Sequence, residues 1–293
     1  MSLLVFGLGY SAMHYVTTRA ASERVSGTVR SAEKAERINA AHANVNPLVF
    51  DGRAADPAIR PRLQSATHLL VSVPPETSGD PVLAHFGEAI ASAPQLKRIV
   101  YLSTIGVYGD ADGAWIDEER SARPNSTRNR ARVIAEQQWL ALGERRGSEI
   151  TIFRLAGIYG PGRNALINLR EGKARRIVKP GQVFNRIHVE DIAGAIAAAF
   201  APDAPSGIFN VTDDEPAPPQ DVIAYAAKLL GIEPPPEIPF ERADLTPMAR
   251  SFYSSNKRVS NRRMKEQLGV SLAYPTYREG FRALAAECLP AAP

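Results

Sequence analysis

The chain opens with a glycine turn of the kind that binds a phosphate group. Gly7, Gly9 and Ala12 stand in a G-x-G-x-x-(G/A) spacing, with Tyr10 and Ser11 between them. The first glycine permits a tight turn, the second leaves room for a diphosphate against the backbone, and a small third residue lets helix and strand pack closely. The amides at the start of the following helix would then face the phosphates. These residues predict a dinucleotide-binding site; the alternative is a tight turn that binds nothing.

The residues at the end of the second expected strand indicate which dinucleotide is bound. An NAD site usually carries an acidic residue about 20 positions after the glycines, where it holds the ribose 2′-hydroxyl. Arg30 and Ser31 stand there instead. A guanidinium binds a 2′-phosphate through two parallel hydrogen bonds, and a hydroxyl adds a donor. We therefore predict NADP, with NAD as the alternative. We also expect Asp51 and Gly52, after the third strand, to contact the adenine.

Composition narrows the class of protein. The chain has 293 residues, a net charge of +4 and one cysteine, Cys288. One cysteine excludes an internal disulfide and a Cys-rich zinc or iron–sulfur site, so we expect no metal. Apolar runs stay shorter than the roughly 18 residues of a membrane helix. The Arg-rich stretch 128–132 has no interleaved aromatic residues. We expect a cytoplasmic protein that acts on a small molecule and binds neither membrane nor nucleic acid; the oligomeric state is not indicated.

Short apolar runs alternate with longer helical patterns through the first two-thirds of the chain. The runs are rich in Val, Ile and Leu with little polar alternation, as expected for strands covered on both faces. The predicted strands are 3–6, 24–29, 46–50, 68–73, 98–102, 149–154 and 208–211. The predicted helices among them are 11–21, 32–41, 81–93, 128–146 and 190–201. This order predicts an α/β fold of the Rossmann type, a doubly wound parallel sheet that binds ligands at the carboxyl ends of its strands.

The character of the chain changes after about residue 210. Prolines cluster there, and the last three predicted helices are 220–230, 260–268 and 277–289. We interpret this region as a small, mainly helical lobe that closes over the sheet. The predicted division is an NAD(P)-binding Rossmann domain of residues 1–160 and 182–212, and a substrate-binding lobe of residues 161–181 and 213–293.

Three further segments and the glycine turn together carry a family resemblance. The segments are 98–109 (RIVYLSTIGVYG), 154–162 (RLAGIYGPG) and 185–193 (NRIHVEDIA). They are similar to the S-(S/T)-x-x-V-Y-G, R-x-x-x-(V/I)-Y-G-P-G and (V/I)-H-V-x-D-(V/I)-A segments of the extended and atypical short-chain dehydrogenase/reductase superfamily, the NAD(P)-dependent epimerase/dehydratase-like proteins. The four segments occur in the family's order and cover nearly the whole chain. The resemblance implies a nicotinamide cofactor and an oxidoreductase or epimerase-like activity.

The resemblance also assigns residues to the site. Ser103 and Thr104 follow a strand and are implied to line the active cleft, where a hydroxyl can hold a substrate carbonyl or hydroxyl. Ser103 is also an expected cofactor contact. The other expected cofactor contacts at strand ends are Val73, Pro74, Leu155, Gly157 and Ile158.

One motif of the superfamily is missing. Relatives carry Y-x-x-x-K, in which the Tyr is the general acid or base and the Lys lowers the pKa of that Tyr and holds the nicotinamide ribose. Aligning on Glu136 puts Arg128 at the Tyr position and Arg132 at the Lys position. A guanidinium stays protonated, so Arg128 cannot transfer a proton as Tyr does. Arg132 can still hold the ribose and supply positive charge, so we expect it to serve both the cofactor and catalysis.

The missing motif leaves the proton donor and the activity open. Tyr108 is the first candidate donor, because its segment borders the cleft in family members, and Tyr159 is the second. We expect Arg128, Tyr159 and Arg186 to contact the substrate, and the two arginines would suit an anionic one. The first hypothesis is an NADP-dependent oxidoreductase or nucleotide-sugar epimerase/dehydratase-like enzyme with a displaced proton donor. The alternative is a non-catalytic NAD(P)-binding regulator or sensor.

Overall fold

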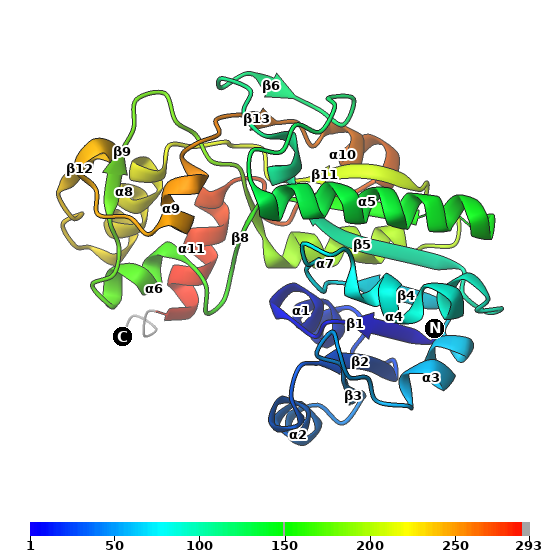
Figure 1. Cartoon of the computed structure of the whole chain (residues 1–293). Coiled ribbons are helices and arrows are strands. Elements are labelled where there is room, and N and C mark those ends of the chain that lie inside the picture. Colours follow the sequence, from blue (N-terminus) through cyan, green and yellow to red (C-terminus); the bar gives the residue numbers. More distant parts are fainter. Residues whose placement is uncertain (149, 289–293) are drawn as a thin grey trace.

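A seven-stranded parallel sheet forms the centre of the molecule, seen in a computed structural model that describes residues 1–148 and 150–288 (Figure 1). The strand order is β11-β7-β5-β4-β1-β2-β3, and every neighbouring pair is parallel. The order changes direction between β1 and β4, so the turn after β1 lies where open α/β sheets bind ligands. The predicted Rossmann-type fold is confirmed.

The bounds of the elements are as follows. The sheet contains β1 (Leu3–Phe6), β2 (Val25–Val29), β3 (Val45–Val49), β4 (His68–Val71), β5 (Arg98–Thr104), β7 (Ile150–Leu155) and β11 (Gly207–Val211). Short parallel pairs are formed by β6 (Trp115–Ile116) with β13 (Arg258–Val259), β8 (Gly157–Tyr159) with β10 (Arg186–His188), and β9 (Arg176–Val178) with β12 (Glu237–Pro239). The helices are α1 (Tyr10–Thr18), α2 (Ala32–Ala41), α3 (Ile59–Ser65), α4 (Pro81–Ala91), η1 (Ile105–Tyr108), α5 (Thr127–Arg146), α6 (Ala165–Arg170), α7 (Val189–Ala199), α8 (Pro219–Leu230), η2 (Phe240–Arg242), α9 (Pro247–Phe252), α10 (Arg262–Leu268) and α11 (Tyr277–Cys288).

The predicted strands and helices agree closely with these bounds. Every predicted strand belongs to the central sheet, and every predicted helix is present, with ends that differ by at most three residues. Positions 149 and 289 of the predicted elements lie outside the described residues. The sequence reading missed α3, α6 and α9, each of which has six or seven residues. Helices this short show too little of the 3.6-residue period to be recognised.

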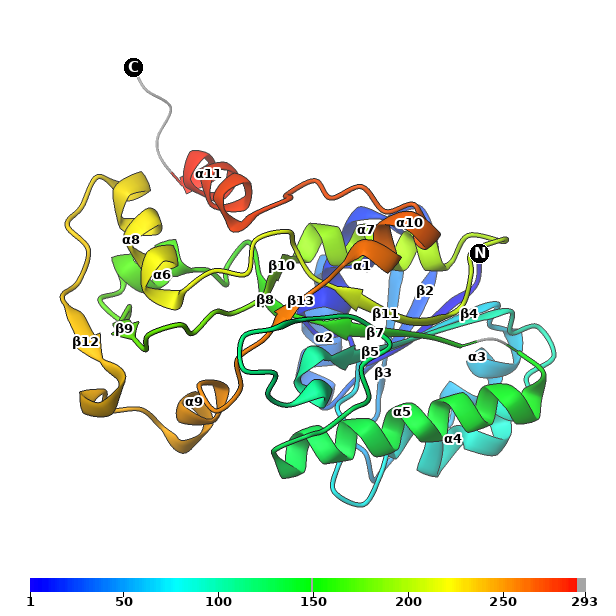
Figure 2. The same ribbon diagram turned by 90° about the horizontal axis from the view of Figure 1, so that it is seen from above.

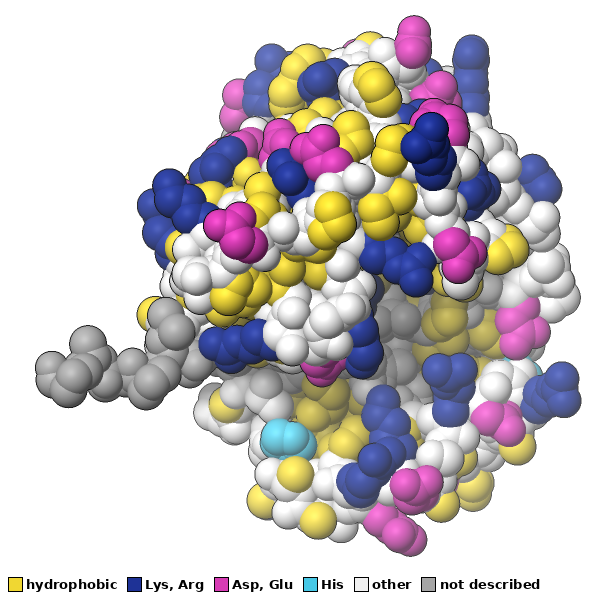
Figure 3. Space-filling view, turned by 90° about the vertical axis from the view of Figure 1, so that its left-hand side faces the viewer, with side chains coloured by type: hydrophobic (Ala, Val, Ile, Leu, Met, Phe, Trp, Pro, Cys, Tyr) yellow, Lys and Arg dark blue, Asp and Glu magenta, His cyan; other side chains and the backbone are white. Residues whose placement is uncertain are grey.

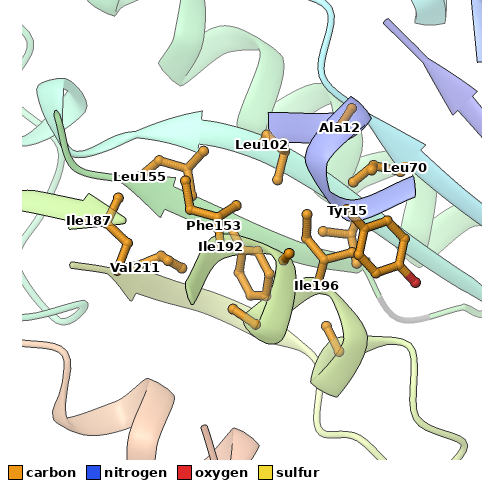
Figure 4. Close-up of a cluster of buried hydrophobic side chains, with 14 of the residues drawn as sticks. Ala12, Tyr15, Leu70, Leu102, Phe153, Leu155, Ile187, Ile192, Ile196 and Val211 are labelled. Atoms are coloured by element: carbon orange, nitrogen blue, oxygen red, sulfur yellow. The ribbon is translucent and has the colours of Figure 1, made fainter. Parts of the chain in front are cut away.

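Helices cover both faces of the sheet, and each face has its own apolar core (Figure 2). Successive strand residues point to opposite faces, so Val5 packs in the core beneath α1 and α7, whereas Leu4 packs in the core beneath α3, α4 and α5. Figure 4 shows the first core, where Ala12 and Tyr15 of α1 lie near Ile192 and Ile196 of α7. The strand side chains labelled in that view are Leu70, Leu102, Phe153, Leu155, Ile187 and Val211.

Most of the remaining helices form a lobe beside the sheet (Figures 1 and 2). Side chains of α6, α8 and α11 share one apolar cluster that includes Leu166, Val222 and Phe281. The segment of α10 differs from the predicted division, because Met264 and Leu268 pack into the core of the sheet and not into the lobe. The rest of the proposed two-domain division stays a prediction.

A single arginine of α5 caps the C-terminal end of α4. The Arg146 guanidinium donates to four backbone carbonyl groups, and its Nε donates to Ser148 Oγ at 3.0 Å. The four carbonyl groups are those of Ile90, Ala91, Ala93 and Leu96. Helix ends leave such carbonyls without partners in the helix, and a cation there also meets the negative end of the helix dipole. Arg146 therefore joins two helices on one face of the sheet.

Replacing this cap tests its contribution to stability. We expect Arg146→Met to lower the free energy of unfolding by about 2–3 kcal/mol, because several half-buried carbonyls lose their donor. Urea unfolding followed by circular dichroism measures the change. The control is Arg145→Met, which removes an exposed ion pair with Glu88 and should change stability by less than about 1 kcal/mol. Equal effects of the two substitutions would contradict the cap.

Candidate functional site

The glycine turn leaves space where a diphosphate would lie. Gly7 has φ +93°, and a Cβ at this position would lie 3.0 Å from the Val73 side chain, so glycine is required. A Cβ at Gly9 would have no atom nearer than 4.0 Å, so the backbone there is open to a ligand. Gly9 is the N-cap of α1, and no side chain caps the first amides of this helix. Ala12 is fully buried, as close packing of α1 on the sheet requires.

Tyr10 joins the start of α1 to the loop after β8. Its hydroxyl donates to the carbonyl of Pro161 at 2.8 Å, and the Arg163 guanidinium lies 5.8 Å from the centre of its ring. Ser11 is buried beside it. The phosphate turn is therefore in direct contact with the 154–162 segment that carries the family resemblance, although the two are far apart in sequence.

The end of β2 is basic in the structure as well as in the sequence. Arg30 is exposed there, and Ser31 is the N-cap of α2, where its side chain accepts a hydrogen bond from the Lys34 amide. The Lys34 ammonium reaches back and donates to the carbonyl of Leu8 inside the glycine turn, at 2.8 Å. Sequence reasoning missed Lys34. The sequence offered one signal for Lys34: it stands one turn into the helix after the second strand, from where a long side chain can fold back over the end of that strand.

The other expected cofactor contacts lie at the neighbouring strand ends. Asp51 is exposed, and its carboxylate accepts hydrogen bonds from the amides of Arg53 and Ala54, which hold the pKa of Asp51 below its usual value. Gly52 follows it with φ +94°. Val73 and Pro74 follow β4, and Val73 contacts Gly7. Leu155 ends β7 and is buried, whereas Gly157 is exposed and Ile158 is half-buried in β8.

Ser103 belongs to a buried polar cluster and not to an open cleft. Its hydroxyl donates to Glu136 Oε1 at 2.5 Å, and the Arg154 guanidinium donates to both carboxylate oxygens of Glu136, with Nη2 at 2.7 Å from Oε2. All three side chains are buried. Because its hydrogen is directed at Glu136, the Ser103 hydroxyl cannot also donate to a substrate or a cofactor. The hydroxyl oxygen can still accept a hydrogen bond, and the assignment of Ser103 to the active cleft stays a prediction.

Thr104 is the better placed of the two expected hydroxyls. It is half-buried at the carboxyl end of β5, and its Oγ1 accepts a hydrogen bond from the Gly106 amide at 3.1 Å as the N-cap of η1. This bond uses the oxygen as an acceptor, so the hydroxyl hydrogen stays available for a ligand.

The two candidate proton donors are both turned into the protein. Tyr108 is fully buried, and its hydroxyl donates to Asn210 Oδ1 at 2.8 Å. Tyr159 is also buried, and a Cβ at Gly280 of α11 would lie 2.3 Å from its hydroxyl, so this group faces the lobe core. Burial raises the pKa of both phenols. Both hydroxyls are buried in this structure, and the roles assigned to Tyr108 and Tyr159 stay predictions.

The two arginines at the positions of the missing motif differ in setting. Arg132 is half-buried, and its Nη1 donates to the Tyr101 hydroxyl at 3.1 Å and to the Leu102 carbonyl at 2.9 Å. Arg128 is exposed at the start of α5, and its guanidinium lies 5.5 Å from the ring centre of Phe252 on α9. Arg132 is therefore fixed against β5, whereas Arg128 bridges from α5 to the lobe.

The surface between sheet and lobe is hollowed and basic. Figure 3 shows this hollow, with Lys and Arg side chains around its rim. Arg186, the last expected substrate contact, is only partly exposed at the start of β10. Within residues 1–148 and 150–288, no helix combines the length and apolar character needed to cross a membrane. In the same residues, no group of three or more His, Cys, Asp or Glu side chains is arranged to hold a metal ion.

Comparisons with known proteins agree on one family. The sequence profile of the NAD dependent epimerase/dehydratase family matches residues 85–212. Protein YeeZ of Escherichia coli (strain K12) is 34% identical over 226 residues, which are 73% of each chain. A 3-diazoavenalumate denitrifying reductase of Streptomyces sp is 27% identical over 290 residues, 90% of this chain and 92% of that one.

Two solved structures extend the likeness. A functionally unknown conserved protein from Silicibacter pomeroyi DSS is 51% identical, with a TM-score of 0.87 and 98% of each chain covered. The UDP-glucuronic acid 4-epimerase from Bacillus cereus, solved in complex with NAD, has a TM-score of 0.75 over 97% of each chain. At 16% identity, that second likeness concerns the fold alone.

The buried cluster around Glu136 yields a stability prediction. We expect Glu136→Gln to lower the free energy of unfolding by about 3–5 kcal/mol, because Arg154 would keep a buried charge without its carboxylate. Urea unfolding measures the loss. Glu171→Gln is the control, since it removes only an exposed pair with Lys173. A change at Glu136 no larger than that of the control would show that the buried pair does not hold α5 to the sheet.

Proposed function

Because the chain belongs to the NAD dependent epimerase/dehydratase family, we propose that it is an NADP-dependent oxidoreductase or nucleotide-sugar epimerase/dehydratase-like enzyme of the atypical short-chain dehydrogenase/reductase type. An oxidoreductase or epimerase-like role follows from the family. The open glycine turn at the head of α1, next to the basic end of β2, is the observation that carries the choice of cofactor.

The residues present fit a nicotinamide dinucleotide. Gly7 and Gly9, with the first amides of α1, would hold the diphosphate. Asp51 and Gly52 would meet the adenine, and the strand-end residues would flank the nicotinamide half. Those residues are Val73, Pro74, Leu155, Gly157 and Ile158. When bound, such a cofactor supplies or accepts a hydride.

The choice of NADP rests on charge at the end of β2. Arg30 is exposed and available to a 2′-phosphate, and Lys34 adds a second cation beside the glycine turn. Two cations favour a phosphate over a bare ribose hydroxyl, which an acidic residue would hold. NAD stays the alternative, since the Bacillus cereus epimerase that shares this fold was solved with NAD.

The catalytic half of the site has a hydroxyl but lacks the usual tyrosine. The Thr104 hydroxyl is the group we assign to the substrate oxygen, and Arg132 is the positive charge behind it. A positioned proton donor contributes roughly 10²–10⁴-fold to a rate, so we expect slow turnover of ordinary carbonyl compounds. The relative named as a denitrifying reductase supports reduction as the direction of the reaction.

The alternative function is a non-catalytic NAD(P)-binding regulator. The burial of Tyr108 and Tyr159 and the arginine at position 128 are the observations that favour it. It predicts cofactor binding without chemistry.

Arg30 provides the test of cofactor choice. We expect Arg30→Ala to weaken NADPH binding by about tenfold or more, because a charge-assisted pair with the 2′-phosphate is lost, and to leave NADH binding unchanged. Fluorescence titration with both cofactors measures the two dissociation constants. Arg37→Ala is the matched control, since it removes an exposed arginine from α2, the helix that follows Arg30. If both cofactors weaken equally, the 2′-phosphate assignment fails.

Thr104 provides the test of catalysis. NADPH oxidation is followed with aldehydes, ketones, sugar nucleotides and diazo compounds as acceptors. We expect turnover with at least one class, and a kcat at least about tenfold lower in Thr104→Val, with NADPH affinity retained, because the hydroxyl assigned to the substrate oxygen is lost. NADPH binding without turnover of any acceptor would contradict the enzyme hypothesis and favour the non-catalytic regulator.

A further inference from the structure

We propose that Arg186 binds the anionic group of the substrate, a carboxylate or a phosphate, beside the nicotinamide half of the cofactor. The proposal rests on the proposed function, because it names the class of compound that the same site would accept. Four features of the structure support it: the position of Arg186, the way its guanidinium is held, the charge around it and the aromatic side chains near it.

Arg186 lies next to Gly157, a predicted cofactor contact. It begins β10, which pairs in parallel with β8 so that Arg186 lies opposite Gly157. Gly157 is exposed, and a Cβ there would approach only the Asn185 carbonyl, at 3.2 Å. Figure 2 shows β8 and β10 between the sheet and the lobe, which is where a substrate would lie against a cofactor bound at the strand ends.

The Arg186 guanidinium is held through one of its nitrogens, Nη1. Nη1 donates to the carbonyls of Phe184 at 2.9 Å and Ala217 at 3.2 Å, two residues that are joined by an antiparallel bridge. The ring of Tyr277 lies 5.8 Å from the guanidinium carbon. Among the described residues, Nε and Nη2 of Arg186 have no hydrogen-bond partner. Two donors on a fixed planar group are the arrangement that grips a carboxylate or phosphate.

Arg186 has no direct carboxylate partner among the described residues. Within the described part of the chain, no carboxylate lies within 4.0 Å of it. Glu215 is paired with Arg278 through two nitrogens. Asp213 is nearby, but burial raises the pKa of Asp213 to about 8 despite the Arg186 guanidinium, so it is largely neutral at pH 7. A largely enclosed cation without a paired carboxylate is costly, and a ligand anion would supply the opposite charge.

Aromatic side chains connect Arg186 to the second arginine of the site. Phe184 packs edge to face on Tyr253, with ring centres 5.1 Å apart. The preceding residue, Phe252, is 49% exposed and carries the Arg128 guanidinium over its ring. The C-terminal end of α9 therefore lies between two arginines and presents an apolar surface. These surroundings suit a ligand with a planar, unsaturated framework that carries an anionic group.

The experiment titrates three probes into the NADPH-saturated protein by calorimetry: trans-cinnamate, UDP and inorganic phosphate. We expect at least one of them to bind, and its dissociation constant to rise about tenfold or more in Arg186→Gln. Binding of cinnamate identifies a carboxylate, binding of UDP a nucleotide, and binding of phosphate alone a phosphate group. Arg262→Gln, at an exposed arginine of α10, removes one positive charge elsewhere and should leave the affinity unchanged.

A second variant leaves Arg186 in place, in case Arg186→Gln loosens the lobe. The charged and titratable groups around Asp213 are Arg186, Asp214, Glu215 and Tyr159. As pH rises through about 8, Asp213 ionises beside Arg186 and competes with the bound anion. Anion affinity should therefore fall above that pH in the unchanged protein, and Asp213→Asn should remove the fall.

The outcomes separate this proposal from the cofactor assignment. If NADPH binds and none of the probes binds with a dissociation constant below about 10 mM, the anion site is overturned and the cofactor assignment stands. The same holds if a probe binds equally well to Arg186→Gln. If NADPH does not bind, the proposed function fails, and titration of the probes into the free protein still decides the role of Arg186.

Discussion

The buried ion pair between Glu136 and Arg154 is the constraint on which the candidate site depends. It joins the middle of α5 to β7, and the Ser103 hydroxyl ties β5 to the same carboxylate. Such a pair is not stabilising merely because it is charged, since removing two ions from water costs several kcal/mol each. Its effect is geometric: with three hydrogen-bonded elements around one carboxylate, α5 can occupy only one position along the sheet. That position sets where Arg128 and Arg132 lie.

The candidate site keeps the family's cofactor-binding features but has lost its usual catalytic motif. The cofactor half keeps the glycine turn, the uncapped start of α1 and a basic end of β2, all of which suit a phosphorylated dinucleotide. The half that would do chemistry has arginines where the family has tyrosine and lysine. Positive charge therefore stands at the sequence positions where the family motif carries its proton donor. A site of this kind favours anionic substrates, or acceptors that need little help with a proton.

Sequence alone could predict what depends on local pattern. The central strands are rich in Val, Ile and Leu because both faces of a parallel sheet are covered, and the glycine turn has a fixed spacing. The contacts that decide the site are not local. Ser103 and Glu136 are 33 positions apart, Tyr108 and Asn210 are 102 apart, and Lys34 reaches Leu8 across 26. A strand pattern shows that Ser103 or Tyr108 is near a strand end, but not which buried partner its hydroxyl binds.

The central claim is that the turn at Gly7 and Gly9 binds a phosphorylated nicotinamide dinucleotide. Isothermal titration of the purified protein with NADPH and with NADH tests it most directly. We expect one molecule bound per chain, with NADPH at least about tenfold tighter than NADH. Absence of heat with either cofactor would contradict dinucleotide binding itself, and a tighter complex with NADH would contradict the reading of Arg30 and Lys34.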